Sequence, residues 1–274
     1  MNVATKALYF FRASQKYKNW LEYSLIRASG QECNKLVLKN GVKIETVESA
    51  RMVVDEIFFW QLYTPAPLFI EENDIVLDIG ANAGVFTLFA ASKTKNTVYA
   101  FEPFPANFEV LQRNIASNAL QNVVAYNSAV SDTSGTGKLF VNPHDGKQNL
   151  LDEHILPEKI AKYKTDEDLD YLDPSKFKQY VNVSITTLQA FMDSNNVQKI
   201  DFLKLDCEGA EGAILFSTPD EYLGHVRKIT MEFHDHLSQY SHDDIQKRLE
   251  EVGFTTQLKW DGISALGYLY GWRQ

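Results

Sequence analysis

A short loop between an apolar run and an amphipathic run most strongly constrains what this chain can fold into. The loop reads Asp78-Ile-Gly-Ala-Asn-Ala-Gly84, after the aliphatic run 74–79 and before a helical pattern over 82–92. From residue 74 onward, short β-branched runs alternate with amphipathic segments, which is typical of βαβ units and a parallel sheet. The sequence therefore predicts an α/β fold in which the loop lies at the carboxyl end of the first strand.

The same alternation predicts the remaining elements. The helix after the second strand carries Phe108, Leu111 and Ile115 on one buried stripe, which places Glu109, Arg113 and Asn114 toward solvent. A late helix is expected to begin with a capping box of Ser241 and Asp244. Further strands are predicted at 97–101, 122–126, 182–185, 200–205 and 228–233, followed by an antiparallel pair at 255–260 and 264–272.

The first 66 residues differ from this pattern and are predicted to form a helical and β-hairpin extension. Residues 35–45 alternate on both sides of Asn40-Gly41, a dipeptide typical of a type I′ hairpin turn. A helix is expected over 48–63, ended by the prolines that follow. The main domain would then span 67–274. Its glycine- and proline-containing insertion at 142–180 is expected to be a lid or a binding loop, or a solvated excursion.

Composition limits the classes of partner and compartment. Hydrophobic residues make up 45% of the chain, enough for a sizeable core, and 36 acidic against 27 basic residues give a net charge of −9. A field of that sign repels phosphate backbones, so we expect no nucleic-acid partner. Two distant cysteines form neither a zinc motif nor a disulfide framework, and no apolar run is long enough to span a membrane. We expect a cytoplasmic protein; its oligomeric state stays open.

The loop chemistry indicates which nucleoside ligand is bound. Glycines allow a sharp turn next to a helix N-terminus, and Glu102 at the end of the second strand can accept hydrogen bonds from ribose hydroxyls. A dinucleotide loop would read G-x-G-x-x-G, whereas this loop begins with Asp78 and has Asn82 in its middle. A leading carboxylate repels pyrophosphate but suits an ammonium group, reached directly or through water. S-adenosylmethionine has an ammonium, a ribose and an adenine but no phosphate.

Several blocks of sequence together resemble FkbM-family methyltransferases. They are DIGANAG, AFEPFPANFEVLQRNI, NSAVSD, ITTLQAF, DFLKLDCEGAE and MEFH, within a match from about residue 35 to 254. The resemblance implies the class I methyltransferase fold, a Rossmann-like doubly wound seven-stranded sheet of order 3-2-1-4-5-7-6. It also implies S-adenosylmethionine as the donor and, most often, O-methylation of a sugar or polyketide hydroxyl. The insertion matches no motif, and acceptor identity is expected to be encoded there.

Carried over by position, the resemblance assigns a donor site. The loop would line the methionine end of the donor, Glu102 would hold the ribose, and the segment after the third strand would border the adenine. The residues predicted to bind the cofactor are Asp78, Gly80, Ala81, Asn82, Gly84, Glu102, Pro103, Ser128, Ala129 and Asp206.

A second cluster follows from the geometry of an open parallel sheet, whose ligand crevice lies beyond the carboxyl ends of its strands. Lys204 and Asp206 share one face at the end of the fourth strand, and Glu208 follows in the turn. Glu232 and His234 share a face on the fifth strand. We expect Lys204, Asp206, Glu208 and His234 to carry the chemistry, although Lys204 could also simply pair with a carboxylate.

Methyl transfer to oxygen requires that the acceptor hydroxyl be aligned and lose its proton. His234 is the candidate base, with Asp206 as the alternative. A divalent cation such as Mg²⁺, held by Asp206, Glu208 and Glu232, could instead lower the hydroxyl pKa. The sequence thus predicts an O-methyltransferase for a sugar, a glycoconjugate or another secondary metabolite. The alternatives are a nucleotide-dependent oxidoreductase and a donor-binding protein without catalysis.

Overall fold

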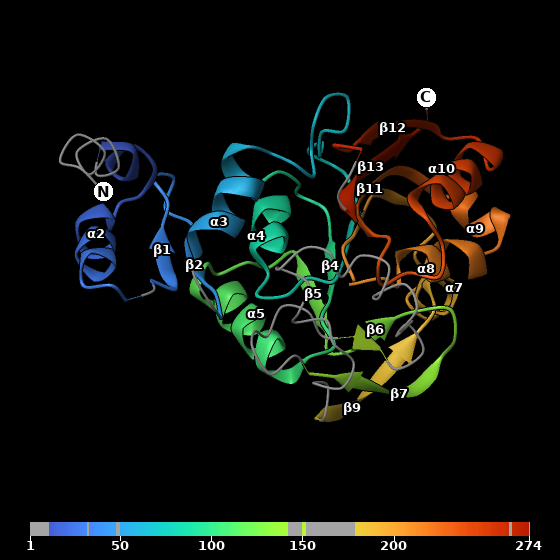
Figure 1. Cartoon of the computed structure of the whole chain (residues 1–274), viewed down its shortest axis with the longest axis horizontal. Helices are drawn as coiled ribbons and strands as arrows, with labels where there is room; N and C mark the ends of the chain where they lie inside the picture. Colours follow the sequence, from blue (N-terminus) through green and yellow to red (C-terminus); the bar gives the residue numbers. More distant parts are fainter. Residues whose placement is uncertain are drawn as a thin grey trace.

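The computed structural model describes residues 11–31, 33–47, 50–141, 150–151, 179–262 and 265–273. Its centre is a seven-stranded sheet, and Figure 1 shows the N-terminal elements on one side of the molecule and the C-terminal strands on the other. In chain order the strands of this sheet are β3 (Val76–Ile79), β4 (Val98–Phe101), β5 (Val123–Tyr126), β10 (Ile200–Leu205), β11 (Val226–His234), β12 (Thr255–Lys259) and β13 (Leu266–Trp272).

The spatial order of these strands is β12-β13-β11-β10-β3-β4-β5. Numbered along the chain, this is the order 3-2-1-4-5-7-6 that the family resemblance implied, so the predicted fold class is confirmed. Strands β5, β4, β3, β10 and β11 run parallel, and β13 pairs antiparallel with both β11 and β12. All residues of β3 and β10 are buried, as expected for central parallel strands covered on both faces.

Helices follow β3, β4 and β11, as the sequence predicts. The late helix begins with the expected capping box, in which Ser241 and Asp244 bond each other's backbone N–H groups. No helix among the described residues is long and apolar enough to cross a membrane. The helices of this domain are α4 (Val85–Ala91), α5 (Pro105–Ser117), α7 (Leu188–Ser194), α8 (Glu211–Ser217), α9 (Asp220–Gly224) and α10 (His242–Glu251).

Asn114 on α5 does not face solvent, and this prediction was wrong. The residue is 1% exposed. Its amide oxygen accepts a hydrogen bond from the backbone N–H of Glu45 at 2.8 Å, and its amide nitrogen donates to the carbonyls of Glu45 and Ala83, each at 2.7 Å. A helical stripe assigns polar residues to water, but here the extension covers that side of the helix. Asn114 therefore links the extension to the glycine loop.

The extension contains α2 (Trp20–Ala28), α3 (Ala50–Val54) and the predicted hairpin of β1 (Lys35–Val37) and β2 (Lys43–Glu45). The turn is not type I′, because only Gly41 of the Asn40-Gly41 pair has a positive φ and its N–H donates to the carbonyl of Leu38. The single helix expected over 48–63 is instead α3 followed by a short π-helix, η1 (Asp55–Phe59).

A second, smaller sheet begins shortly after β5 in the chain. Its order is β6-β9-β7-β8, from β6 (Ala129–Val130), β7 (Gly135–Phe140), β8 (Leu150–Leu151) and β9 (Tyr180–Thr186). The strand predicted at 182–185 thus belongs to this sheet, seen in the lower part of Figure 1. Most of the predicted insertion at 142–180 lies outside the described residues.

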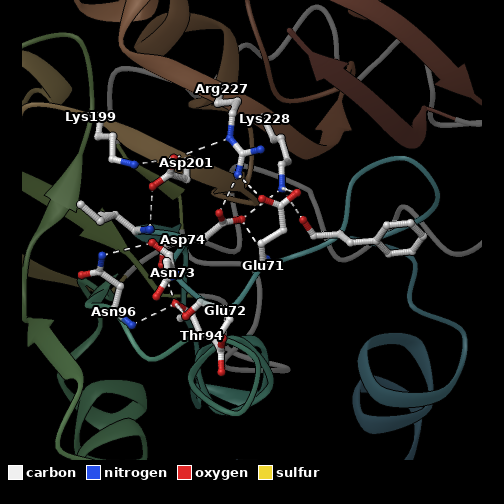
Figure 2. Close-up of polar contacts among 12 residues, drawn as sticks. Glu71, Glu72, Asn73, Asp74, Thr94, Asn96, Lys199, Asp201, Arg227 and Lys228 are labelled. Carbon is white, nitrogen blue, oxygen red and sulfur yellow. Dashed lines mark hydrogen bonds and ion pairs between the residues drawn. The ribbon is translucent and has the colours of Figure 1, made fainter. Parts of the chain in front are cut away.

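An ion cluster joins three central strands at their amino ends, as Figure 2 shows. Asp74, just before β3, accepts from Arg227 at 2.6 Å and from Lys228 at 3.0 Å, both on β11. Asp201 on β10 contacts Arg227 at 3.5 Å and accepts the backbone N–H of Ile75. The cluster fixes the register of β3, β10 and β11 and leaves their carboxyl ends for the site.

Candidate active site

A cavity opens at the carboxyl ends of the central parallel strands, where the topology predicts a ligand crevice. Residues after β3, β4, β5 and β10 and at the end of β11 line it, together with residues of the extension. Of the predicted site residues, the cavity wall includes Gly80, Ala81, Asn82, Glu102, Pro103, Ser128, Ala129, Lys204, Asp206, Glu208, Glu232 and His234.

The glycine loop turns sharply at the end of β3. Gly80 has a φ of +78°, and a Cβ added there would lie 1.7 Å from the carbonyl oxygen of Asp206. Glycine is therefore required because the loop passes directly against the end of β10, a reason that the sequence did not supply. Gly84 has a φ of +83° and packs against Leu111 instead of lining the cavity.

Asp78 lies behind the cavity wall, fully buried. The hydroxyl of Thr87 donates to its Oδ2 at 2.6 Å, and Lys204 Nζ is 3.2 Å from its Oδ1. This placement does not favour direct contact between Asp78 and the ammonium group of the methyl donor. Contact through water stays a prediction. Asp78 instead balances the charge of a buried lysine.

Lys204 joins the glycine loop to β10. Its Nζ donates to the carbonyl oxygen of Gly80 at 2.7 Å and lies 3.5 Å from Asp206 Oδ2. Burial alone would lower the pKa of this amine, but the charges of Asp78 and Asp206 outweigh it and raise the pKa above its usual value. Lys204 is thus a protonated, buried side chain in the cavity wall. This agrees with the interpretation that it pairs with neighbouring carboxylates.

Glu102 holds the loop from the neighbouring strand. Its Oε2 accepts the backbone N–H of Asn82 at 2.8 Å, and its Oε1 accepts that of Phe104 at 2.9 Å. Burial raises its pKa to about 7, although these backbone hydrogen bonds favour the charged form. The carboxylate therefore faces the cavity at a fixed position, where its remaining lone pairs can accept ligand hydroxyls.

The far end of the cavity is an acidic rim, defined as Asp206, Glu208 and Glu232. The hydroxyl of Tyr63 lies 2.9 Å from Asp206 Oδ2 and 3.0 Å from Glu232 Oε2. Burial is the main cause that raises the pKa of Glu208 to about 8 and that of Glu232 to about 7. Burial thus favours the protonated form of these two glutamates more than it does for an exposed carboxyl group.

His234 lies between two glutamates. Its Nδ1 is 3.1 Å from Glu211 Oε1, and its Nε2 is 3.4 Å from Glu208 Oε2. Burial would lower the pKa of the imidazole, but Glu208 and Glu211 together raise it well above its usual value. Glu211 itself is fully buried at the start of α8 and also accepts the backbone N–H groups of Cys207 and Gly209. Both ring nitrogens therefore already face carboxylates.

The predicted cation ligands come together in part. Ligand atoms of Asp206, Glu232 and His234 lie within 4.8 Å of one another, whereas Glu208 turns toward His234. A three-donor group of this kind can hold a cation, but proximity alone does not show one.

Sequence reasoning missed most of the contribution of the extension. Glu56 on η1 and Tyr63 after it line the cavity, together with Val47, which follows the hairpin, and Val53 on α3. By sequence, Tyr63 is one of several aromatics that could stack on a sugar or serve packing. Nothing in the sequence places its hydroxyl beside Asp206 and Glu232, because that contact depends on how the extension packs on the sheet.

The comparison with known proteins decides the family. The model of the methyltransferase FkbM domain matches residues 78–256, from the glycine loop to the start of β12. The chain belongs to the FkbM methyltransferase family. Its methyltransferase fold, with the glycine loop at the carboxyl end of β3, supports S-adenosylmethionine as the methyl donor.

Three curated relatives illustrate the family. Methyltransferase sdnD of Sordaria araneosa is 30% identical and covers 75% of this chain and 82% of its own. The 31-O-demethyl-FK506 methyltransferase FkbM of Streptomyces tacrolimicus is 27% identical, and the match covers 73% of this chain and 81% of that protein. The hexuronic acid methyltransferase AglP of Haloferax volcanii is 26% identical, and the match covers 69% of this chain and 66% of that protein. The solved methyltransferase FkbM of Methylobacillus flagellatus is 11% identical with a TM-score of 0.48, covering 98% of this chain and 60% of its own.

Proposed function

We propose that this FkbM methyltransferase transfers a methyl group from S-adenosylmethionine to a hydroxyl of a sugar, a glycoconjugate or another secondary metabolite. One observation carries the proposal: a single cavity joins the glycine loop and Glu102 to the acidic rim. The name of one relative, a 31-O-demethyl-FK506 methyltransferase, supports an oxygen acceptor, and the name of another, a hexuronic acid methyltransferase, supports a sugar acceptor. A cytoplasmic location and the absence of a nucleic-acid partner stay predictions.

The donor fits the residues at the loop end of the cavity. S-adenosylmethionine supplies a methyl group on a sulfonium, which is a good leaving group. Residues 80–82 would border its methionine part, Glu102 would accept the ribose hydroxyls, and Ser128 and Ala129 would border the adenine. Glu102 is suited to this role because both of its oxygens are already oriented by backbone N–H groups.

Asp206 is the proton acceptor that the geometry favours. Its side chain is 25% exposed against 5% for His234, so it is the more accessible of the two candidates. The acceptor oxygen forms a bond to the methyl carbon as the carbon–sulfur bond breaks, and the electron pair of that bond goes to sulfur. The hydroxyl proton goes to Asp206. His234, held by Glu208 and Glu211, would provide positive charge beside the rim.

A divalent cation is the second candidate for activating the hydroxyl, favoured by the close donor atoms of Asp206, Glu232 and His234. A cation would lower the hydroxyl pKa without a protein base. The two mechanisms differ in one measurable property, because only the second loses activity when a chelator is added.

The experiment that tests the function has two parts. Calorimetric titration with S-adenosylhomocysteine and with NAD tests the donor class, and we expect binding of the first alone. A panel of glycosides and polyketide alcohols with methyl-labelled donor then tests the acceptor. Binding of NAD in place of S-adenosylhomocysteine would favour the oxidoreductase, and donor binding without methylation of any hydroxyl would favour a binding protein.

A further inference from the structure

Tyr63 belongs to the extension and precedes the matched domain, yet its hydroxyl ends at the acidic rim. The residue is 6% exposed. Its hydroxyl oxygen is within 3.0 Å of carboxylate oxygens on two different strand ends, Asp206 after β10 and Glu232 on β11. A segment outside the matched domain thus contributes a polar atom to the site.

The packing of the Tyr63 ring fixes where that hydroxyl points. The ring meets Phe86 edge-on, with centroids 5.7 Å apart, and Tyr268 likewise at 5.5 Å. Lys204 Nζ lies 5.5 Å from the centroid of the same ring. Because aromatic rings and an ammonium surround it, the group that Tyr63 presents to the rim is its hydroxyl.

The two short contacts place one donor between two carboxyl groups. A phenol has one hydrogen and donates to one carboxylate at a time. The Tyr63 hydroxyl lies within donating distance of both Asp206 Oδ2 and Glu232 Oε2, at 2.9 and 3.0 Å, so either carboxylate can accept its hydrogen. The two carboxyl groups therefore share a single hydrogen-bond donor.

We propose that Tyr63 is a positioning residue that holds Asp206 and Glu232 together and leaves Asp206 oriented to take the acceptor proton. The inference rests on the proposed function. Ligand oxygens of Asp206 and Glu232 lie within 4.8 Å of each other, and the Tyr63 hydroxyl is the group that bridges them. Loss of the hydroxyl should therefore disturb the rim and leave the donor end, on β3 and β4, unchanged.

The test compares Tyr63→Phe with Tyr17→Phe and wild type, using the full chain. Tyr17 is a matched control in the extension: it is 2% exposed, its hydroxyl donates to the carboxylate of Asp55 at 3.3 Å, and it does not line the cavity. Crystal structures with S-adenosylhomocysteine give the rim geometry, calorimetry gives the affinity for that ligand, and the best acceptor of the panel gives kcat and KM.

In Tyr63→Phe we expect the Asp206 and Glu232 oxygens to separate, with the affinity for S-adenosylhomocysteine unchanged. We expect kcat to fall about 10- to 100-fold, the effect of one hydrogen bond to a charged group, with KM little changed. Tyr17→Phe should keep both the rim geometry and kcat. The crystal structures need no acceptor, so their result does not depend on which acceptor the proposed function assigns.

If Asp206 and Glu232 keep their positions in Tyr63→Phe, the inference is overturned, whatever the value of kcat. Equal losses of kcat in Tyr63→Phe and Tyr17→Phe also overturn it, because they would show a general effect of loosening the extension. Failure of wild type to bind S-adenosylhomocysteine would contradict the proposed function instead.

Discussion

Lys204 Nζ donates a 2.7 Å hydrogen bond to the carbonyl oxygen of Gly80 while it lies 3.2 Å from Asp78 Oδ1. The buried ammonium of Lys204 thus neutralises the charge of Asp78, where the loop begins, and bonds the carbonyl of Gly80, which borders the cavity. The donor site and the fold share this contact, so stability and ligand binding should respond together when it is lost.

Lys204→Met is expected to destabilise the protein by about 3–5 kcal/mol, because it leaves Asp78 buried without a positive partner. Urea unfolding measures the loss. Lys95→Met is the matched control, since the pair of Lys95 with Glu72 is mostly exposed and should contribute little. Equal stability of the two variants would show that Asp78 does not depend on Lys204.

Gly80→Ala is expected to damage the site more than Gly84→Ala, although both glycines have positive φ. The added Cβ at Gly80 meets the backbone carbonyl of Asp206 at 1.7 Å, whereas at Gly84 it meets the side chain of Leu111 at 2.3 Å. A side-chain end can move, but a strand backbone cannot without shifting β10. We expect loss of S-adenosylhomocysteine binding in Gly80→Ala by calorimetry, and retained binding in Gly84→Ala would agree.

Donor affinity is expected to rise with pH through about 7. The ionised form of Glu102 accepts the ribose hydroxyls, and burial raises the pKa of this carboxyl to about 7, so acid removes the binding form. At pH 5.5 the Glu102 carboxyl is ionised in about one molecule in thirty, and this fraction sets the upper limit of the loss of donor affinity. Calorimetry at pH 5.5 and 8 measures it. Glu102→Gln should bind weakly at both values, and an equal pH dependence in that variant would exclude Glu102 as the cause.

Asp206→Asn is expected to lower kcat by about 10²–10⁴, the usual contribution of general base catalysis, with little change in donor affinity. His234→Gln should lower it less, because His234 does not take the proton in this account. The opposite order of effects would make His234 the base. Loss of wild-type activity on adding a chelator would instead assign the chemistry to a cation at Asp206, Glu232 and His234.

The sequence predicted the parts of this protein that depend on local pattern. Strand alternation, the capping box at Ser241 and the loop after β3 are all decided by neighbours in the chain, and the structure has them. The turn at Gly41 and the solvent-facing placement of Asn114 were wrong. Asn114 is decided by β2, which packs on α5 from 69 residues earlier in the chain.

The candidate site divides in the same way. Residues at strand ends, such as Asp206 and Glu232, could be placed because parallel strands end at one edge. Tyr63 could not be placed, because its hydroxyl reaches the rim only through packing between the extension and the sheet. Asp78 was predicted to line the cavity. In the structure it pairs with the buried amine of Lys204 and lies behind the cavity wall.

The central claim is methyl transfer from S-adenosylmethionine to an acceptor hydroxyl. Its most direct test is mass spectrometry of the acceptor panel after incubation with donor carrying a ¹³C-labelled methyl group, for wild type and Asp206→Asn. We predict the label on an oxygen of at least one hydroxyl compound, formed by wild type and strongly reduced in the variant. Label on a nitrogen or carbon atom, or an equal yield from both proteins, would contradict the account.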